Sequence, residues 1–78
     1  MTLEQLKNQS SQVRVVRLTP LPLMESTDWS AQISYQLSET LCDEPLNRDS
    51  GDLRVFKNLE SAYRYMRRHG VTAPILII

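Results

Sequence analysis

The chain has 78 residues, enough for one domain, and 41% of them are hydrophobic, which is ordinary for a folded globular protein. Two glycines and four prolines argue against a disordered or low-complexity chain. No stretch approaches the roughly 18 apolar residues that span a bilayer, and the first eight residues lack the apolar core of a signal peptide. The single Cys42 cannot form an internal disulfide, which fits a reducing compartment. We therefore expect a cytoplasmic protein without a membrane segment.

Nine basic and nine acidic residues give a formal net charge of zero, but these charges are unevenly distributed. The net charge is +2 over residues 1–24, −6 over residues 25–52 and +4 over residues 53–78. Such a dipolar chain suits complementary or head-to-tail protein contacts better than polyanion binding. The alternative explanation is that its loops are simply acidic.

The first 28 residues predict a helix, a strand and a proline-rich connection. Thr2 and Gln5 match a capping box and predict a short helix over residues 2–9. Residues 13–18 are rich in valine, and two arginines interrupt the apolar run, as in a strand with one solvated side. Two prolines then predict an extended edge or loop over residues 19–24, which lays Leu21 and Leu23 against the core. Residues 25–28 are expected to turn the chain.

Residues 29–38 alternate between apolar and uncharged polar side chains without a fault, which predicts a strand with a dry and a wet face. The dry face carries Trp29, Ala31, Ile33, Tyr35 and Leu37. The wet face carries the candidate contact residues Ser30, Gln32, Ser34 and Gln36, followed by Ser38. This wet face is either a solvated surface or a surface that receives another protein, because nothing on it repels a partner. At a sheet edge, the strand could pair with a second copy.

Turn-forming residues are clustered in residues 39–52 and predict a loop that reverses the chain. Residues 53–56 predict a third strand. A long helix follows, with Asn58 as its N-cap and Gly70 just after its end. Its packed face consists of Leu59, Ala62, Tyr63 and Met66. The apolar residues 71–78 predict a strand inside the sheet, parallel to the third strand and joined to it by a right-handed crossover.

Together these elements predict a single α+β domain over residues 1–78. We expect a three- to four-stranded, mostly antiparallel sheet, one long C-terminal helix packed on one face and a short N-terminal helix. The expected core consists of Trp29, Ile33, Tyr35, Val55, Ala62, Tyr63, Met66, Ile75 and Ile77.

The residues available for catalysis are few. One histidine and one cysteine cannot form a zinc site, and two glycines do not form a phosphate-binding loop. His69 falls at the end of the predicted helix, where its cation interacts favourably with the helix dipole. We therefore expect a non-enzymatic protein with no catalytic residue, cofactor or metal.

A basic stripe is the main candidate for binding. Arg64, Arg67 and Arg68 fall at i, i+3 and i+4, opposite the packed face of the predicted helix, and Tyr65 lies beside them. The candidate contact residues are Arg54, Lys57, Arg64, Arg67 and Arg68. Such a stripe is either a solvated helix face, a binding site for an acidic protein or a binding site for the phosphates of nucleic acid. The zero net charge and the acidic loop weigh against nucleic acid.

Residues 49–62 read Asp-Ser-Gly-Asp-Leu-Arg-Val-Phe-Lys-Asn-Leu-Glu-Ser-Ala. With the alternating strand before them, they resemble small bacterial proteins of unknown function, in which a hairpin with an Asp/Gly turn leads to a helix and a final strand. The resemblance covers most of the chain in layout and only this segment in detail, and the Thr-Pro-Leu-Pro-Leu segment departs from it. It implies a compact α+β domain and no functional residues. We expect a small non-enzymatic protein-binding or regulatory domain that is able to form a homodimer, with a nucleic-acid-binding accessory protein that uses the basic helix stripe as the alternative.

Overall fold

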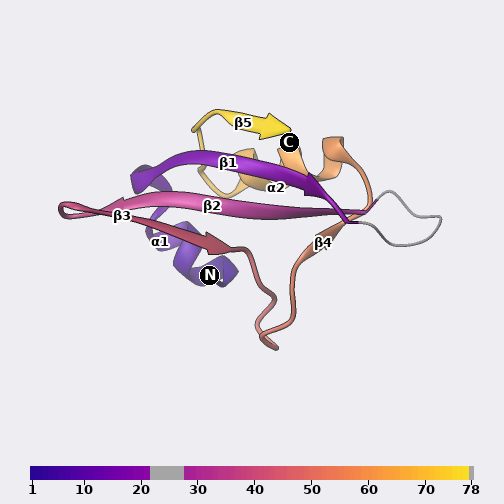
Figure 1. The fold of residues 1–78 in the computed structure, drawn as a ribbon, viewed down its shortest axis with the longest axis horizontal. Coiled ribbons are helices and arrows are strands. Elements are labelled where there is room, and N and C mark those ends of the chain that lie inside the picture. Colours follow the sequence, from indigo (N-terminus) through magenta and orange to yellow (C-terminus); the bar gives the residue numbers. More distant parts are fainter. Residues whose placement is uncertain (22–27, 78) are drawn as a thin grey trace.

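The structure, a computed structural model, describes residues 1–21 and 28–77 (Figure 1). Its elements are α1 (Leu3–Asn8), a 3-10 turn (Ser10–Gln12), β1 (Val13–Pro20), β2 (Trp29–Leu37), β3 (Thr40–Pro45), β4 (Val55–Phe56), α2 (Leu59–Arg68) and β5 (Ile75–Ile77). They form a mixed five-stranded sheet with both helices on one face.

The α+β class and the short N-terminal helix are confirmed. Two details are wrong: the sheet has five strands rather than three or four, and α2 has ten residues, so the C-terminal helix is short. The expected packing of Leu23 lies outside the described residues, as does the turn expected over residues 25–28 except for its last residue. Within the described part of the chain, no helix has the length and apolar character needed to cross a membrane.

Strand β2 occupies the centre of the sheet. It pairs antiparallel with β1 on one side and with β3 and β4 on the other, and β5 pairs parallel with β1. Because β2 has neighbours on both sides, it is not available to pair with the β2 strand of a second copy.

Strand β5 is an edge strand, which corrects the expectation of an interior one. It runs in the same direction as β4, as the crossover requires, but β2 and β1 lie between the two strands. Its outer edge therefore has no partner among the described strands, and Leu76 and Ile77 are 50% and 61% exposed. Apolar sequence alone did not reveal that only one side of this strand is paired.

A β-bulge at Arg14 explains the irregular pattern of β1. Val13 pairs with Tyr35 and Val15 with Ser34, so Arg14 is an extra residue without a cross-strand partner. Val13 and Val16 are three residues apart and could not share a face of a regular strand. The bulge lets both point into the core and leaves Arg14 exposed.

The segment expected to be a loop, residues 39–52, contains strand β3. Ser38 and Glu39 connect β2 to β3, and Ser38 adopts a left-handed conformation with φ of 54°. The acidic residues of β3 find partners on the sheet: Asp43 forms an ion pair with Arg17, and Glu44 accepts a hydrogen bond from the Tyr35 hydroxyl. That hydrogen bond, together with burial, raises the pKa of Tyr35. These contacts explain why a charged segment forms a strand.

Both helices begin and end as their sequences predict. The Thr2 side chain accepts from the Gln5 amide, and the Asn58 side chain accepts from the Ser61 amide at 2.8 Å. Gly70, with φ of 87°, follows α2, and its amide donates to the Arg67 carbonyl. The next amide, that of Val71, donates to the Met66 carbonyl, which completes the helix C-cap.

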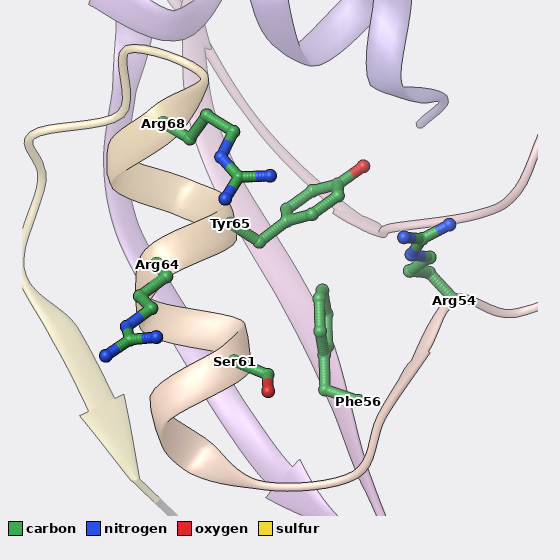
Figure 2. A pocket seen from close by; sticks show the side chains of 6 residues that line it. All are labelled: Arg54, Phe56, Ser61, Arg64, Tyr65 and Arg68. Atoms are coloured by element: carbon green, nitrogen blue, oxygen red, sulfur yellow. The ribbon is translucent and has the colours of Figure 1, made fainter.

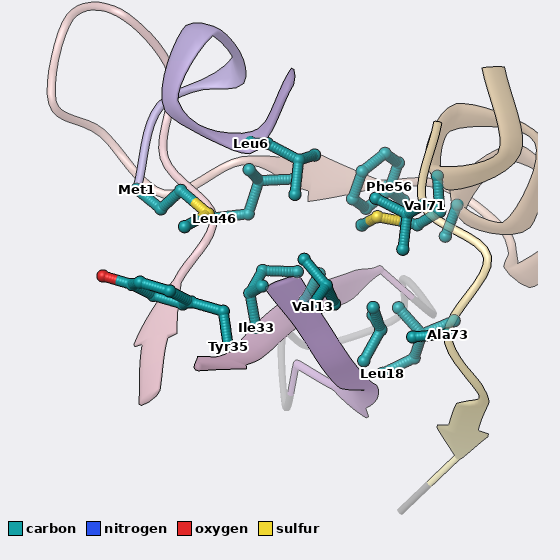
Figure 3. Packing of buried hydrophobic residues seen from close by; sticks show 14 residues of the cluster. Met1, Leu6, Val13, Leu18, Ile33, Tyr35, Leu46, Phe56, Val71 and Ala73 are labelled. Carbon is teal, nitrogen blue, oxygen red and sulfur yellow. The ribbon is translucent and has the colours of Figure 1, made fainter. Parts of the chain in front are cut away.

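The core lies between the sheet and the two helices (Figure 3). Among the expected core residues, Ile33, Tyr35, Ala62 and Met66 are buried, while Trp29, Val55 and Ile75 are partly buried. Tyr63 and Ile77 are exposed, so placing them in the core is wrong. The buried side of α2 is marked by Ala62 and Met66. With this side facing the sheet, Tyr65 rather than Tyr63 packs against Phe56. Further buried residues, beyond that expected list, are Met1, Leu6, Val13, Val16, Leu18, Ala31, Leu46, Phe56, Val71 and Ala73.

Candidate functional site

Two pockets that share Arg54 and Tyr65 lie on the helix side of the sheet. The first has a volume of about 300 Å³ and is lined by Arg54, Phe56, Ser61, Arg64, Tyr65 and Arg68 (Figure 2). The second has a volume of about 330 Å³ and is lined by Leu3, Arg54, Tyr65 and residues 47–50. We call the two pockets together the basic groove.

Helix α2 and a turn contribute most of the lining of this groove, and Leu3 of α1, Arg54 and Phe56 of β4 complete it. Helix α2 contributes Ser61, Arg64, Tyr65 and Arg68, which follow one side of the helix at i, i+3, i+4 and i+7. A turn contributes the opposite wall: the Arg48 amide donates to the Asp52 carbonyl at 2.7 Å, and the Gly51 amide donates to the Arg48 carbonyl at 2.9 Å.

Arg54 comes from the segment that joins this turn to β4. Its backbone amide donates to the carbonyl of the buried Leu46 at 2.9 Å. This hydrogen bond ties the position of Arg54 in the groove wall to the core.

Aromatic rings hold the middle of the groove. The Tyr65 ring packs edge-to-face against Phe56, with centroids 5.2 Å apart, and against His69, with centroids 4.7 Å apart. The Arg54 guanidinium lies 5.0 Å from the Tyr65 centroid and 5.9 Å from the Phe56 centroid, within cation–π range. Figure 2 shows the Tyr65 ring between the guanidinium groups of Arg54 and Arg68.

The charge of the groove is predominantly positive. Arg64 forms an ion pair with Glu60 at 2.6 Å, whereas Arg54 and Arg68 form no ion pair within residues 1–21 and 28–77. Burial lowers the pKa of His69, and the positive charges of Lys7, Arg68 and Arg54 lower it further. Burial raises the pKa of Tyr65, with Arg54 opposing that shift and Asp49 adding to it. Cations without a partner carboxylate, gathered around a partly buried pocket, form a surface suited to an anion.

The structure separates the arginines that the sequence placed in one stripe. Arg54, Arg64 and Arg68 meet in the first pocket. Arg67 points elsewhere: its Nη1 donates to the carbonyls of Val71 at 2.8 Å and Ala73 at 3.0 Å, and its guanidinium lies over the Tyr63 ring. Lys57 is exposed between β4 and α2 and does not line either pocket.

The candidate contact residues on the wet face of β2 do not form a continuous exposed surface. Ser30, Gln32 and Gln36 are partly buried, and Ser34 is only 3% exposed. The Ser34 hydroxyl donates to Asp43 Oδ1 at 3.2 Å, and Asp43 pairs with Arg17. Asp43 and Arg17 lie on the two strands that flank Ser34, so their ion pair covers the serine.

Several groove residues were not recognised as such from the sequence. The spacing of Ser61, Arg64, Tyr65 and Arg68 was a usable signal, because these positions share one side of any helix. No sequence signal could have placed Leu3 and residues 47–50 in one pocket with Tyr65, since that pocket joins segments far apart in the chain.

Within the described ranges, 1–21 and 28–77, no group of three or more histidine, cysteine, aspartate or glutamate residues is placed to hold a metal ion. Comparison of the chain with protein-family models, curated proteins and solved structures finds no match. Fold and site together define a small α+β domain with a basic, aromatic groove on its helix side.

Proposed function

We propose that the chain is a non-enzymatic protein-binding domain whose basic groove receives an acidic segment of a partner protein. The observation that carries this proposal is the position of Arg54 and Arg68, two arginines without a carboxylate partner in the described residues, on either side of Tyr65. Arginine presents a planar set of donors that matches a carboxylate with two parallel hydrogen bonds.

The packing of the aromatic rings favours a carboxylate ligand over a nucleic-acid base. Arg54 covers the ring of Tyr65, and Phe56 and His69 pack against it edge-to-face. A base needs an open ring face for stacking, and these neighbours leave Tyr65 little room to provide one.

The surrounding charge also favours a short acidic segment. Asp49 lines the second pocket, and Glu60 is paired with Arg64 at the edge of the first. A long polyphosphate backbone would approach both carboxylates, whereas two or three acidic side chains can reach Arg54 and Arg68 alone. The zero net charge of the chain points the same way.

The test measures binding of a fluorescent ten-residue glutamate-rich peptide by anisotropy at low salt. Replacing either groove arginine, as Arg54→Gln or Arg68→Gln, should weaken binding about tenfold, because each change removes a charge-assisted hydrogen bond. Arg14→Gln is the matched control: Arg14 is exposed and lies outside both pockets, so this variant should bind as the unmodified protein does.

Three outcomes would contradict the proposal. The unmodified protein could fail to bind the peptide at low salt, or Arg14→Gln could weaken binding as much as the groove variants, which would indicate non-specific attraction. Tighter binding of a single-stranded oligonucleotide of equal charge, lost in the same groove variants, would instead support the nucleic-acid alternative.

A further inference from the structure

The face of the sheet turned away from the helices carries no helix of the described residues (Figure 1). Cross-strand register places Val15, Ser34 and Asp43 side by side across β1, β2 and β3. It likewise aligns Arg17 with Leu76 of β5, while Leu41 lies farther along β3. We call these six residues and their same-side neighbours on the strands the open face.

Among residues with a cross-strand partner, the open face is electrically neutral. Its charged side chains are Arg17 and Asp43, which form an ion pair. Leu41 and Leu76 project from it near opposite edges of the sheet and are 62% and 50% exposed. The basic groove, in contrast, lies on the other side of the sheet, and its Arg54 and Arg68 have no ion pair with any described residue.

We propose that the open face packs against the open face of a second copy of this chain. A neutral surface does not repel its own copy, and it gives a strongly charged partner nothing to recognise. Arg17 and Asp43 are of opposite sign, and their side chains are 30% and 48% exposed, so they can meet the same pair of the partner across a two-fold axis.

The dimensions of the open face suit a dimer. Four strands at a spacing of about 4.8 Å span roughly 19 Å, and the nine residues of β2 extend for about 30 Å. The other strands are shorter, with eight residues in β1, six in β3 and three in β5, so the backbone footprint is about 400 Å². Projecting side chains raise the accessible area above this footprint, toward the lower end of the range centred on about 800 Å² per partner that is typical of stable interfaces. A chain of this length buries only about 60% of its unfolded surface by itself, so a second copy supplies burial that the fold lacks.

Neighbouring residues of β5 provide a matched test by sedimentation over a range of concentrations. Leu76 points to the open face and Ile77 to the helix side, and both are well exposed. Leu76→Glu should raise the dimer dissociation constant at least about 100-fold, because two unpaired carboxylates would be buried per dimer. Ile77→Glu should leave the dimer unchanged.

Leu41→Glu tests the opposite edge of the same face and should also dissociate the dimer. It settles the question if Leu76→Glu disturbs folding, which circular dichroism would reveal. An unmodified chain that stays monomeric up to about 1 mM would overturn the proposal. Equal weakening by Leu76→Glu and Ile77→Glu would overturn it as well, because it would indicate pairing along the β5 edge. A dimer that resists both Leu76→Glu and Leu41→Glu would do the same.

The two surfaces can be tested separately. This dimer does not depend on ligand binding in the groove, and its arginine variants leave the open face intact. Loss of peptide binding with an unchanged dimer, or the reverse, would distinguish the two proposals.

Discussion

Leu46 and Leu53 flank one turn, yet only Leu46 belongs to the core. Leu46 has no exposed surface, whereas Leu53 is 38% exposed. We expect Leu46→Ala to lower the free energy of unfolding by about 2–5 kcal/mol, since it leaves a cavity, and Leu53→Ala to lower it by less than about 1 kcal/mol. Urea unfolding measures both free-energy changes, provided that the m-value of each variant equals that of the unmodified protein. Equal losses of free energy in the two variants would contradict the different burial of Leu46 and Leu53.

His69 should link peptide binding to pH. Burial and the positive charges of Lys7, Arg68 and Arg54 lower its pKa in the free protein, which favours the neutral form. Carboxylates bound in the groove would offset these charges and raise that pKa again. Binding should therefore take up a proton, and affinity for the glutamate-rich peptide should increase as the pH falls from about 7 to about 5.5.

Calorimetry in two buffers of different ionisation enthalpy measures this proton uptake directly. His69→Gln serves as the control, because glutamine keeps polar contacts but does not titrate in this range. Proton uptake that persists in His69→Gln, or its absence in the unmodified protein, would rule out His69 as the linked group.

The arginines of helix α2 have different structural roles. Arg67 donates to two backbone carbonyls after the helix, those of Val71 and Ala73. Arg64 instead forms an exposed ion pair with Glu60, which lies one turn earlier in the helix. We expect Arg67→Gln to reduce the free energy of unfolding by about 1–3 kcal/mol, because it leaves half-buried carbonyls without a charged donor. Arg64→Gln should change it by no more than about 0.5 kcal/mol. Thermal denaturation of both variants provides the comparison.

At the level of elements, local sequence signals were sufficient to predict the ends of the helices and the strand whose apolar and polar residues alternate. Thr2, Asn58 and Gly70 marked the helix ends, and the alternation of residues 29–37 marked β2. Strand β3 was missed because its stability comes from pairing with β2 and from Arg17 and Tyr35, which lie far away in the sequence. The edge position of β5 depends in the same way on its pairing with β1.

The candidate site was only partly predictable for a related reason. Helical spacing alone does not say which side of α2 faces the sheet. Tyr63, which was expected in the core, is exposed, and Tyr65, which was expected beside the basic stripe, packs against Phe56. That rotation also decides which arginines meet: Arg64 and Arg68 join Arg54, and Arg67 does not. Composition could suggest a basic surface, but only tertiary packing could select its members.

For the whole molecule, the sheet separates two surfaces of different character. The helix side carries the basic groove, and the open face is neutral apart from one ion pair. This arrangement leaves room for two kinds of contact at once, one with an acidic ligand and one with a second copy.

Because both helices lie on one face of the sheet, the two surfaces point away from each other. A dimer joined through the open faces would carry its two grooves on opposite outer sides, too far apart to close around one short ligand. Such a dimer would be bivalent: it would bridge two acidic segments, and it would hold a partner with repeated segments much more tightly than one groove could.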